Sequence, residues 1–210
     1  MYGVGGANCQ CVENMIHWGH SRGKIMNRAI KFKMKNGKVV TIRRIRGTDY
    51  DAMMKFFDKF VHDPSAKYTS MYLGQPKYSK ESCVALYDNP NNLFLGAWDG
   101  DKIIGESTIT RVSPNNPKYR GLTGITGSII LDKYTSNGLG GKLKTMIEKW
   151  ARENGVHKLE GEVFHKNVRS LSNLMRHGYN IVGIKHDAAI VDNEWMHIYV
   201  LEKILANKKG

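Results

Sequence analysis

The stretch YTSNGLGGKLKTMIEKWARENG, residues 134–155, places three glycines at the start of a helix-forming pattern. Its apolar residues recur at helical spacing and form one stripe, made of Leu139, Leu143, Met146, Ile147, Trp150 and Ala151. Glycine inside a helix costs roughly 1 kcal/mol relative to alanine, so Gly138, Gly140 and Gly141 need a reason. The Asn-Gly pair at 154–155 ends the helix as a C-cap. The stretch predicts an amphipathic helix whose N-terminus is closely approached by another group.

A glycine-rich turn that leads from a strand into a helix is an arrangement by which proteins hold phosphate groups. The first-turn amides lack partners inside the helix, and the helix dipole adds partial positive charge. Without Cβ atoms in the turn, a diphosphate can reach the backbone. The preceding residues LTGITGSIILD, at 122–132, predict the strand. The glycine spacing matches neither a P-loop nor a dinucleotide fingerprint, so the turn indicates a phosphate-containing ligand without identifying it.

Strands and helices are mixed along the rest of the chain, with no internal repeat. Two strands around Asn36-Gly37 are predicted as a hairpin, because Asn-Gly between alternating segments is the strongest short hairpin signal. Further strands are predicted within 92–112 and at 158–164, 179–191 and 194–205, and helices at 48–61, 81–88 and 167–178. This is an α/β (α+β) domain around one sheet at 30–210, preceded by an irregular N-terminal extension at 1–29.

The charge of the chain is concentrated near its start. The formal net charge is +13 at pH 7, and the first 48 residues hold ten Lys or Arg against one acid. Such a segment favours polyanionic partners, here a nucleic acid or an acidic protein, although a solvated surface explains it equally well. The basic residues with the clearest pattern are Lys31, Lys33, Lys35, Arg43, Arg44 and Arg46.

The cysteines and the hydropathy of the chain predict a cytoplasmic protein. Cys9, Cys11 and Cys83 are too few for a disulfide framework, and neither a membrane-spanning run nor a signal-peptide pattern is present. Together with His17 and His20, the first two cysteines offer the ligand types of a tetrahedral zinc site. Their spacing is not that of a common zinc finger, so ordinary Cys and His side chains are the better explanation and no metal is expected.

The order of elements around the glycine-rich turn resembles the core of the GNAT superfamily of N-acetyltransferases. Members bind acetyl-CoA at a strand-turn-helix segment of the form Q/R-x-x-G-x-G/A, here TSNGLG at 135–140, with Thr135 in place of Gln or Arg. Downstream, LEGEVFHKNVRSLSNLMRHGY at 159–179 is similar to the family's Glu-Val strand, its Asn, and its helix that closes with Gly and an aromatic residue. The resemblance covers about 38–205. It implies a mixed, mostly antiparallel sheet of about seven strands flanked by about four helices. To this the chain is expected to add an extra hairpin strand and the basic N-terminal extension, which lies outside the resemblance.

The resemblance also implies a binding site for acetyl-CoA as cosubstrate. The pantetheine arm would contact the strand backbone, the pyrophosphate would lie in the turn and helix entrance, and an Asn side chain would complete the site. The residues implied are Ile129, Ile130 and Leu131 for the strand, Asn137, Gly138, Leu139, Gly140, Gly141 and Lys142 for the turn, and Asn167. Lys142 and Lys144 either add positive charge at the helix entrance or lie on a solvated helix face.

Acetyl transfer to an amine needs a neutral nucleophile and a donor to the carbonyl oxygen, and often an acid for the departing thiolate. A strand amide near Ile130 or Leu131 is the candidate donor. Glu162 matches a position where some family members place a general base, although a salt-bridged surface acid is the alternative. Glu106 is a second candidate, because a lone acid in an otherwise apolar strand requires an explanation.

The sequence departs from the family at the general acid. Members that use a tyrosine carry it four residues before the helix-ending glycine, and this chain has Leu174 there. Protonation of the thiolate then falls to water, Tyr134, Ser170 or Tyr179, with Tyr179 as the chosen candidate, or the thiolate leaves unprotonated. We expect an N-acetyltransferase whose amine substrate, acidic or associated with nucleic acid, attacks the thioester directly. The alternative is a GNAT-fold protein that binds or modifies nucleic acid and has atypical or lost acetyltransferase chemistry.

Overall fold

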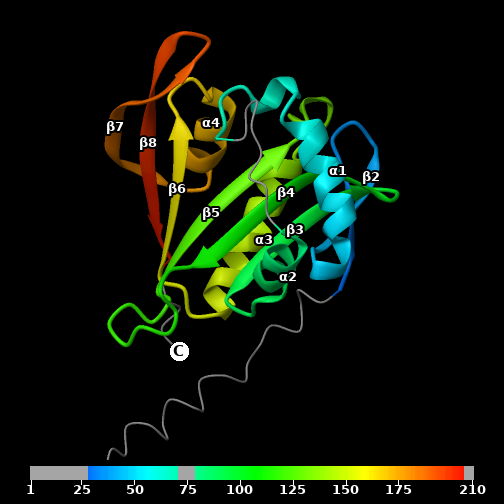
Figure 1. Cartoon of the computed structure of the whole chain (residues 1–210), viewed down its shortest axis with the longest axis horizontal. Coiled ribbons are helices and arrows are strands. Elements are labelled where there is room, and N and C mark those ends of the chain that lie inside the picture. Colours follow the sequence, from blue (N-terminus) through cyan, green and yellow to red (C-terminus); the bar gives the residue numbers. More distant parts are fainter. Residues whose placement is uncertain (1–27, 71–78, 206–210) are drawn as a thin grey trace, which may run out of the picture.

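The computed structural model describes residues 28–70 and 79–205, which fold around one eight-stranded sheet (Figure 1). The strands are β1 (Ile30–Lys33), β2 (Val39–Arg44), β3 (Asn92–Asp99), β4 (Lys102–Arg111), β5 (Thr123–Ile130), β6 (Lys158–Phe164), β7 (Asn180–Val191) and β8 (Glu194–Ile204). The α-helices are α1 (Tyr50–Phe60), α2 (Lys80–Asp88), α3 (Leu139–Glu153) and α4 (Val168–Arg176). The strand order is β1-β2-β3-β4-β5-β6-β8-β7. Helices α1 and α2 cover one face of the sheet, and α3 and α4 cover the other.

The core lies between these two helix layers and the middle of the sheet. Strand β3 is buried along nearly its whole length, because helices cover both of its faces. Helix α1 contributes Met53, Phe56 and Phe60, which are spaced by three and four residues. From the opposite face α3 contributes most of its predicted apolar stripe, with Leu139, Leu143, Ile147, Trp150 and Ala151 buried and Met146 half-buried. Burying each large apolar side chain contributes roughly 1.5–3 kcal/mol.

The predicted hairpin forms at the edge of the sheet. Strands β1 and β2 pair antiparallel with Ile30 opposite Ile42, and Gly37 in the turn has a φ of 85°. Left-handed backbone of this kind favours glycine, which explains the Asn-Gly sequence. Strand β1 alternates half-buried apolar residues with exposed lysines, as its sequence predicts.

Strands β5 and β6 separate partway along their length. Their parallel pairing covers only three positions and ends with Ile125 opposite Glu160. Beyond that point β5 continues antiparallel with β4, and β6 continues antiparallel with β8. Figure 1 shows the two strands diverging toward their carboxyl ends. The divergence leaves one edge of β5 without a strand partner, so its backbone polar groups there must bond to something else.

The predicted fold class is confirmed. The sheet is mixed and mostly antiparallel, the eighth strand is the extra hairpin strand, and four α-helices flank the sheet in the described ranges. The predicted N-terminal extension lies outside the described residues except for residues 28–29, and so do Cys9, Cys11, His17 and His20. Within residues 28–70 and 79–205, no three His, Cys, Asp or Glu side chains gather as a metal site. In the same ranges, no helix is both long and apolar enough to cross a membrane.

Candidate active site

A cavity of about 240 Å³ lies where β5 and β6 separate. Its walls come from both strands, from the first two turns of α4, and from the segment that follows a short 3-10 helix η5 (Pro64–Ala66). The residues that line it are Tyr68, Thr69, Ser70, Thr126, Gly127, Ser128, Ile129, Lys144, Gly161, Glu162, Val163, Phe164, Asn167, Ser170, Asn173, Leu174 and Ile198. The predicted site residues Ile129, Glu162 and Asn167 are therefore brought together at this cavity.

The backbone of β5 presents alternate residues to the cavity. The amide of Leu131 donates to the carbonyl oxygen of Ile104 on β4 at 3.0 Å. Because N–H and C=O groups alternate in direction along an antiparallel strand, Ile129 also directs its backbone groups to β4. Ser128 and Ile130 direct theirs to the opposite side, where β6 has moved away. Of the predicted strand contacts, Ile130 directs its amide to the side that β6 has left but does not itself line the cavity, whereas the amide of Leu131 is used by the sheet. Sequence reasoning missed Ser128, which the two-residue period counted back from Ile130 identifies.

The turn before α3 leaves the first amides of that helix uncapped. Gly138 is the N-cap, has a φ of 84° and makes no side-chain capping bond, and the first turn contains no acid. A Cβ on Gly140 would lie 3.5 Å from Ile130 Cδ1, and one on Gly141 would lie 3.6 Å from His177 Nε2. Both are ordinary van der Waals distances. Backbone conformation thus requires glycine at 138, but internal packing does not require it at 140 or 141. Close approach of a ligand, predicted from the sequence as the reason for these two glycines, stays a prediction.

The β1–β2 hairpin packs directly against this turn. The amide of Lys35 donates to the carbonyl oxygen of Asn137 at 3.1 Å. A Cβ on Gly138 would lie 3.9 Å from Lys35 Cε and 3.8 Å from Phe32 Cζ, so the aliphatic stem of Lys35 runs beside the turn. The amide of Lys142 bonds to the carbonyl oxygen of Gly138 at 3.0 Å and is used inside the helix. One lysine of the predicted basic row therefore lies next to the N-terminus of α3.

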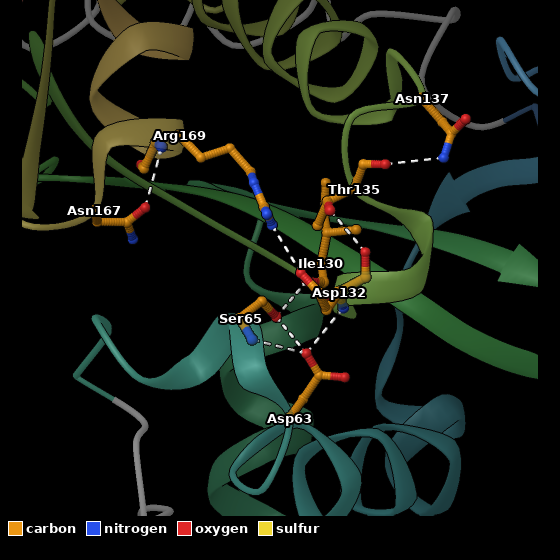
Figure 2. A network of polar contacts seen from close by, with 9 residues as sticks. Asp63, Ser65, Ile130, Asp132, Thr135, Asn137, Asn167 and Arg169 are labelled. Atoms are coloured by element: carbon orange, nitrogen blue, oxygen red, sulfur yellow. Dashed lines mark hydrogen bonds and ion pairs between the residues drawn. The ribbon is translucent and has the colours of Figure 1, made fainter.

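A polar network fixes the end of β5 beside the cavity (Figure 2). Asp63 Oδ1 accepts from the backbone amides of Ser65 at 3.0 Å and Asp132 at 2.9 Å. The single hydroxyl proton of Ser65 lies between two acceptors, Asp63 Oδ1 at 2.6 Å and the carbonyl oxygen of Ile130 at 2.8 Å. Asp132 Oδ1 in turn accepts from Arg169 Nη1 of α4 at 3.0 Å. The network thus ties the segment before the cavity, the end of β5 and the start of α4 into one unit.

Asn167 holds two walls of the cavity together. Its Oδ1 accepts from the amide of Ser170 at 3.1 Å and caps α4, while its Nδ2 donates to the carbonyl oxygen of Tyr68 at 3.0 Å. A side-chain cap of this kind stabilises a helix by about 1 kcal/mol. The predicted cofactor side chain therefore lines the cavity and also positions α4 and the Tyr68 segment.

The two predicted general bases have different surroundings. Glu162 lines the cavity, is half-exposed and forms an ion pair with Lys185. Glu106 on β4 is 5% exposed and does not line the cavity. Burial raises the pKa of Tyr87 on α2, and the charge that Glu106 carries when ionised raises that pKa further. Burial raises the pKa of Glu106 itself to about 8, because the charged carboxylate would lose its solvation there. At neutral pH Glu106 is a buried neutral acid.

We expect Glu106→Gln to remove a pH dependence of stability. A carboxyl whose folded pKa is raised stabilises the fold fully below its unfolded pKa of about 4.5, and this contribution is lost as the pH rises through about 8. Between pH 5 and pH 8 the free energy of unfolding of the wild type should therefore fall relative to Glu106→Gln, by about 3.5 kcal/mol. Urea unfolding at both pH values measures this. The exposed acid variant Asp101→Asn should behave like the wild type, and an equal pH dependence in Glu106→Gln would show that Glu106 is ionised in the fold.

The predicted proton donors to a thiolate are mostly placed elsewhere. Tyr179 is 2% exposed, does not line the cavity, and burial raises its pKa above the ordinary range of tyrosine. The hydroxyl of Tyr134 donates to Asp99 Oδ2 at 2.8 Å. Ser170 and Leu174 do line the cavity, the first with a hydroxyl and the second with an apolar side chain.

The position of Lys144 corrects both sequence-based expectations for it. Its side chain is 3% exposed and its Nζ lies 3.4 Å from Thr126 Oγ1, so it is neither at the helix entrance nor on a solvated face. The helical period explains this, because Lys144 shares a face with Ile147 and Ala151, three and seven residues on. The prediction gave more weight to the charge of the lysine, which favours exposure, than to the helical period, which places this position on the buried face. Burial lowers the pKa of Lys144 to about 8.

Two arginines of the predicted basic segment are bound within the fold. Arg43 forms two hydrogen bonds of 2.8 Å with Asp49, and its guanidinium lies 3.9 Å from the centre of the Trp98 ring. The two N–H groups of Arg44 Nη2 are shared among three backbone carbonyl oxygens within hydrogen-bond distance, those of Tyr87, Asn89 and Asn92. These two side chains therefore stabilise the packing of β2 against its neighbours. Arg46 is exposed.

Comparison with known proteins agrees with this geometry. A family model described as an acetyltransferase (GNAT) domain matches residues 42–200. A GNAT-family acetyltransferase from Streptococcus pneumoniae is similar in structure, with a TM-score of 0.71 and 22% identity over 80% of this chain and 99% of that one. A ribosomal-protein-S5-alanine acetyltransferase from Vibrio fischeri has a TM-score of 0.67 and 17% identity over 87% and 98%. The protein yncA from Salmonella typhimurium, solved with its cofactor acetyl-CoA, has a TM-score of 0.65 and 15% identity over 81% and 96%. At these identities the structures show a shared fold. No curated protein matches the chain in sequence.

Proposed function

The chain belongs to the GNAT family of acetyltransferases, and we propose that it transfers the acetyl group of acetyl-CoA to an amine that attacks the thioester directly. The observation that carries the proposal is the separation of β5 and β6 after Ile125, which opens the cavity beside the uncapped N-terminus of α3. Asn173 lines the cavity and lies within 4 Å of a Cβ on Gly140, so the two features are continuous. A long ligand with a diphosphate at one end fits both at once.

The donor set at the helix entrance suits a diphosphate. The amides of Leu139, Gly140 and Gly141 have no acceptor inside the helix, and no acid in the first turn opposes an anion. Lys35, from the hairpin, adds positive charge beside the turn. Farther in, the backbone groups of Ser128 and the amide of Ile130 face the side that β6 has left and can bond to a pantetheine arm, whereas the carbonyl oxygen of Ile130 already accepts from Ser65. When bound, acetyl-CoA supplies an activated acetyl group.

We assign the remaining roles to side chains and amides of the cavity. The amide of Ser128 or Ile130 donates to the carbonyl oxygen that becomes negative during transfer. Glu162 accepts the proton of the amine, directly or through water, because it lines the cavity and Glu106 does not. For this role Glu162 must part from Lys185, which its exposure allows. Asn167 keeps α4 and the Tyr68 segment in place around the ligand.

For the acceptor we propose an acidic or nucleic-acid-associated amine. The support is the positive charge of the hairpin, where Lys35 lies beside the turn and Lys31 and Lys33 are exposed on β1. A cytoplasmic location is part of the proposal and is supported by the low cysteine content. If the chain instead binds nucleic acid without acetyl transfer, a labelled oligonucleotide should bind with an affinity that falls steeply with salt, and CoA should not bind.

Isothermal titration tests the proposed ligand. Acetyl-CoA and CoA should both bind, with dissociation constants in the range of roughly 1 μM to 1 mM that is usual for enzyme substrates. Pantetheine alone should bind at least about tenfold more weakly, because it lacks the diphosphate that the helix entrance holds. Absence of binding heat with acetyl-CoA at concentrations above this range would reject the proposal. Equal affinity for CoA and pantetheine would reject the role of the turn.

A further inference from the structure

Lys144 places a positive charge where a protein interior normally avoids one. It is the one cationic side chain among the described residues that line the cavity, and only 3% of its surface is exposed. Its Nζ lies 3.4 Å from Thr126 Oγ1 and 5.3 Å from the centre of the Tyr179 ring. Thr126 already donates its hydroxyl proton to the carbonyl oxygen of Glu160, so it is a pure acceptor toward Lys144.

The charged groups around Lys144 do not neutralise it. The nearest acid is Glu148, one turn along α3, and its two oxygens lie 2.7 Å from Lys203 Nζ and 3.3 Å from His177 Nδ1. Lys203, on β8, is itself positively charged, and its repulsion lowers the pKa of Lys144 further. Among the described residues no carboxylate forms an ion pair with Lys144. A buried, unpaired cation is costly, and a cavity that retains one is suited to an anion that forms there.

The place of Lys144 in the cavity indicates which anion this is. Thr126 is the first residue of β5 beyond the last pair with β6, so Lys144 lies at the closed end of the divergence. The uncapped amides of α3 that suit a diphosphate lie at the open end. The thioester is at the opposite end of acetyl-CoA from the diphosphate. The sulfur therefore belongs at the closed end, near Lys144.

On the basis of the proposed function, we propose that the Lys144 ammonium stabilises and then protonates the thiolate released by acetyl transfer. The amine nitrogen forms a bond to the thioester carbonyl carbon, the C–S bond breaks, and its electron pair stays on sulfur. Lys144 donates one proton to that sulfur and becomes a neutral amine. The proton lost by the acceptor amine passes to Glu162 or water, and solvent later returns a proton to Lys144. No oxidant or further reactant is needed.

Two further observations agree with this role. An ordinary thiol has a pKa of about 8.5, and burial lowers the pKa of Lys144 to about 8, so the proton transfer is nearly balanced in energy. Leu174, whose side chain also lines the cavity, has no proton to give. Tyr68 has a hydroxyl, but it also lines the neighbouring cavity with Asp132, Lys166 and Arg169, at the outer side of the site.

The pKa of the CoA thiol in the complex tests the proposal without any acceptor. CoA is bound to the wild type, to Lys144→Met and to Lys149→Met, and the ultraviolet absorbance of the thiolate is followed against pH. A cation within about 4–6 Å should lower the thiol pKa by about 1–3 units, so thiolate should appear at lower pH in the wild type and Lys149→Met than in Lys144→Met. Lys149 is the matched control, because it lies on the same helix but is exposed.

The outcomes separate the two proposals. If CoA binds none of the three proteins, the proposed function and this role are both wrong. If CoA binds all three and the thiol pKa is unchanged in Lys144→Met, the role of Lys144 alone is wrong. Methionine is apolar and its side chain is similar in length to that of lysine, so Lys144→Met should fold. Thermal unfolding measures this. If Lys144→Met does not fold, the thiol pKa can be measured in Lys144→Leu instead, which also lacks the positive charge. A second variant, Leu174→Tyr in the Lys144→Met background, supplies a new proton donor and should recover part of the acetyl transfer lost with Lys144.

Discussion

Replacing Gly140 by alanine should weaken acetyl-CoA binding at least about tenfold, equivalent to about 1.4 kcal/mol, while leaving the fold intact. The new methyl group would lie 3.5 Å from Ile130 Cδ1 and 3.7 Å from Asn173 Nδ2, which the protein accommodates without movement. It would point into the space between the end of β5 and α4, where the ligand must reach the first amides of α3. The affinity is measured by isothermal titration with acetyl-CoA.

Stability provides the control for this variant. Gly140 has a helical backbone, and replacing such a glycine by alanine usually leaves stability unchanged or raises it by up to about 1 kcal/mol. Loss of binding together with unchanged or higher thermal stability would separate a ligand contact from a folding defect. Thr145→Ala, an exposed position on the same helix, should keep full affinity. If Gly140→Ala binds acetyl-CoA as tightly as the wild type, the glycine does not serve the ligand.

Asp63→Ala should destabilise the protein by about 2 kcal/mol and lower the melting temperature by about 4–8 °C. The single oxygen Asp63 Oδ1 accepts from the amides of Ser65 and Asp132, and the substitution leaves both without that acceptor. The end of β5 would lose its anchor at Asp132, so acetyl-CoA affinity should fall by about tenfold as well. Thermal unfolding and isothermal titration measure the two effects.

Asp63→Asn distinguishes the hydrogen bonds from the charge. Its amide oxygen can still accept from both backbone amides, so the loss should stay below about 1 kcal/mol and the affinity should be nearly kept. If Asp63→Ala is as stable as the wild type, the network does not hold the end of β5. If Asp63→Asn is as damaged as Asp63→Ala, the negative charge of Asp63, rather than its acceptor oxygen, stabilises this region.

Structural features that depend on residues close together in the sequence could be predicted from it. The hairpin at Asn36-Gly37 and the helix that follows Gly138 depend on local conformation and on periodic apolar residues, and both form as predicted. The glycine-rich turn indicated a phosphate ligand because backbone amides at a helix N-terminus have a fixed geometry. The resemblance to the GNAT superfamily then supplied the type of sheet, mixed and mostly antiparallel, with about four flanking helices.

Features that depend on residues far apart in the chain were not predictable. The hydrogen bond between Asp63 and the amide of Asp132 joins positions 69 residues apart, so no local sequence pattern predicts it. The departure of β5 from β6 at Ile125 depends on the pairing of β6 with β8. The position of Lys144 was predicted wrongly. Its charge favoured an exposed site and the helical period of α3 favoured a buried one, and the side chain is buried.

The contact between the hairpin and the cofactor turn also bears on how the chain avoids self-association. The family match begins at residue 42, within β2, and so leaves out β1 altogether. Without β1, the outer edge of β2 would expose unpaired backbone groups to any passing strand, which is a common route to aggregation. In the whole chain β1 covers that edge and turns its exposed lysines outward, where like charges repel. The same short strand that brings Lys35 beside the turn before α3 therefore also covers the edge of the sheet, and a shortened version of this protein should begin before Ile30.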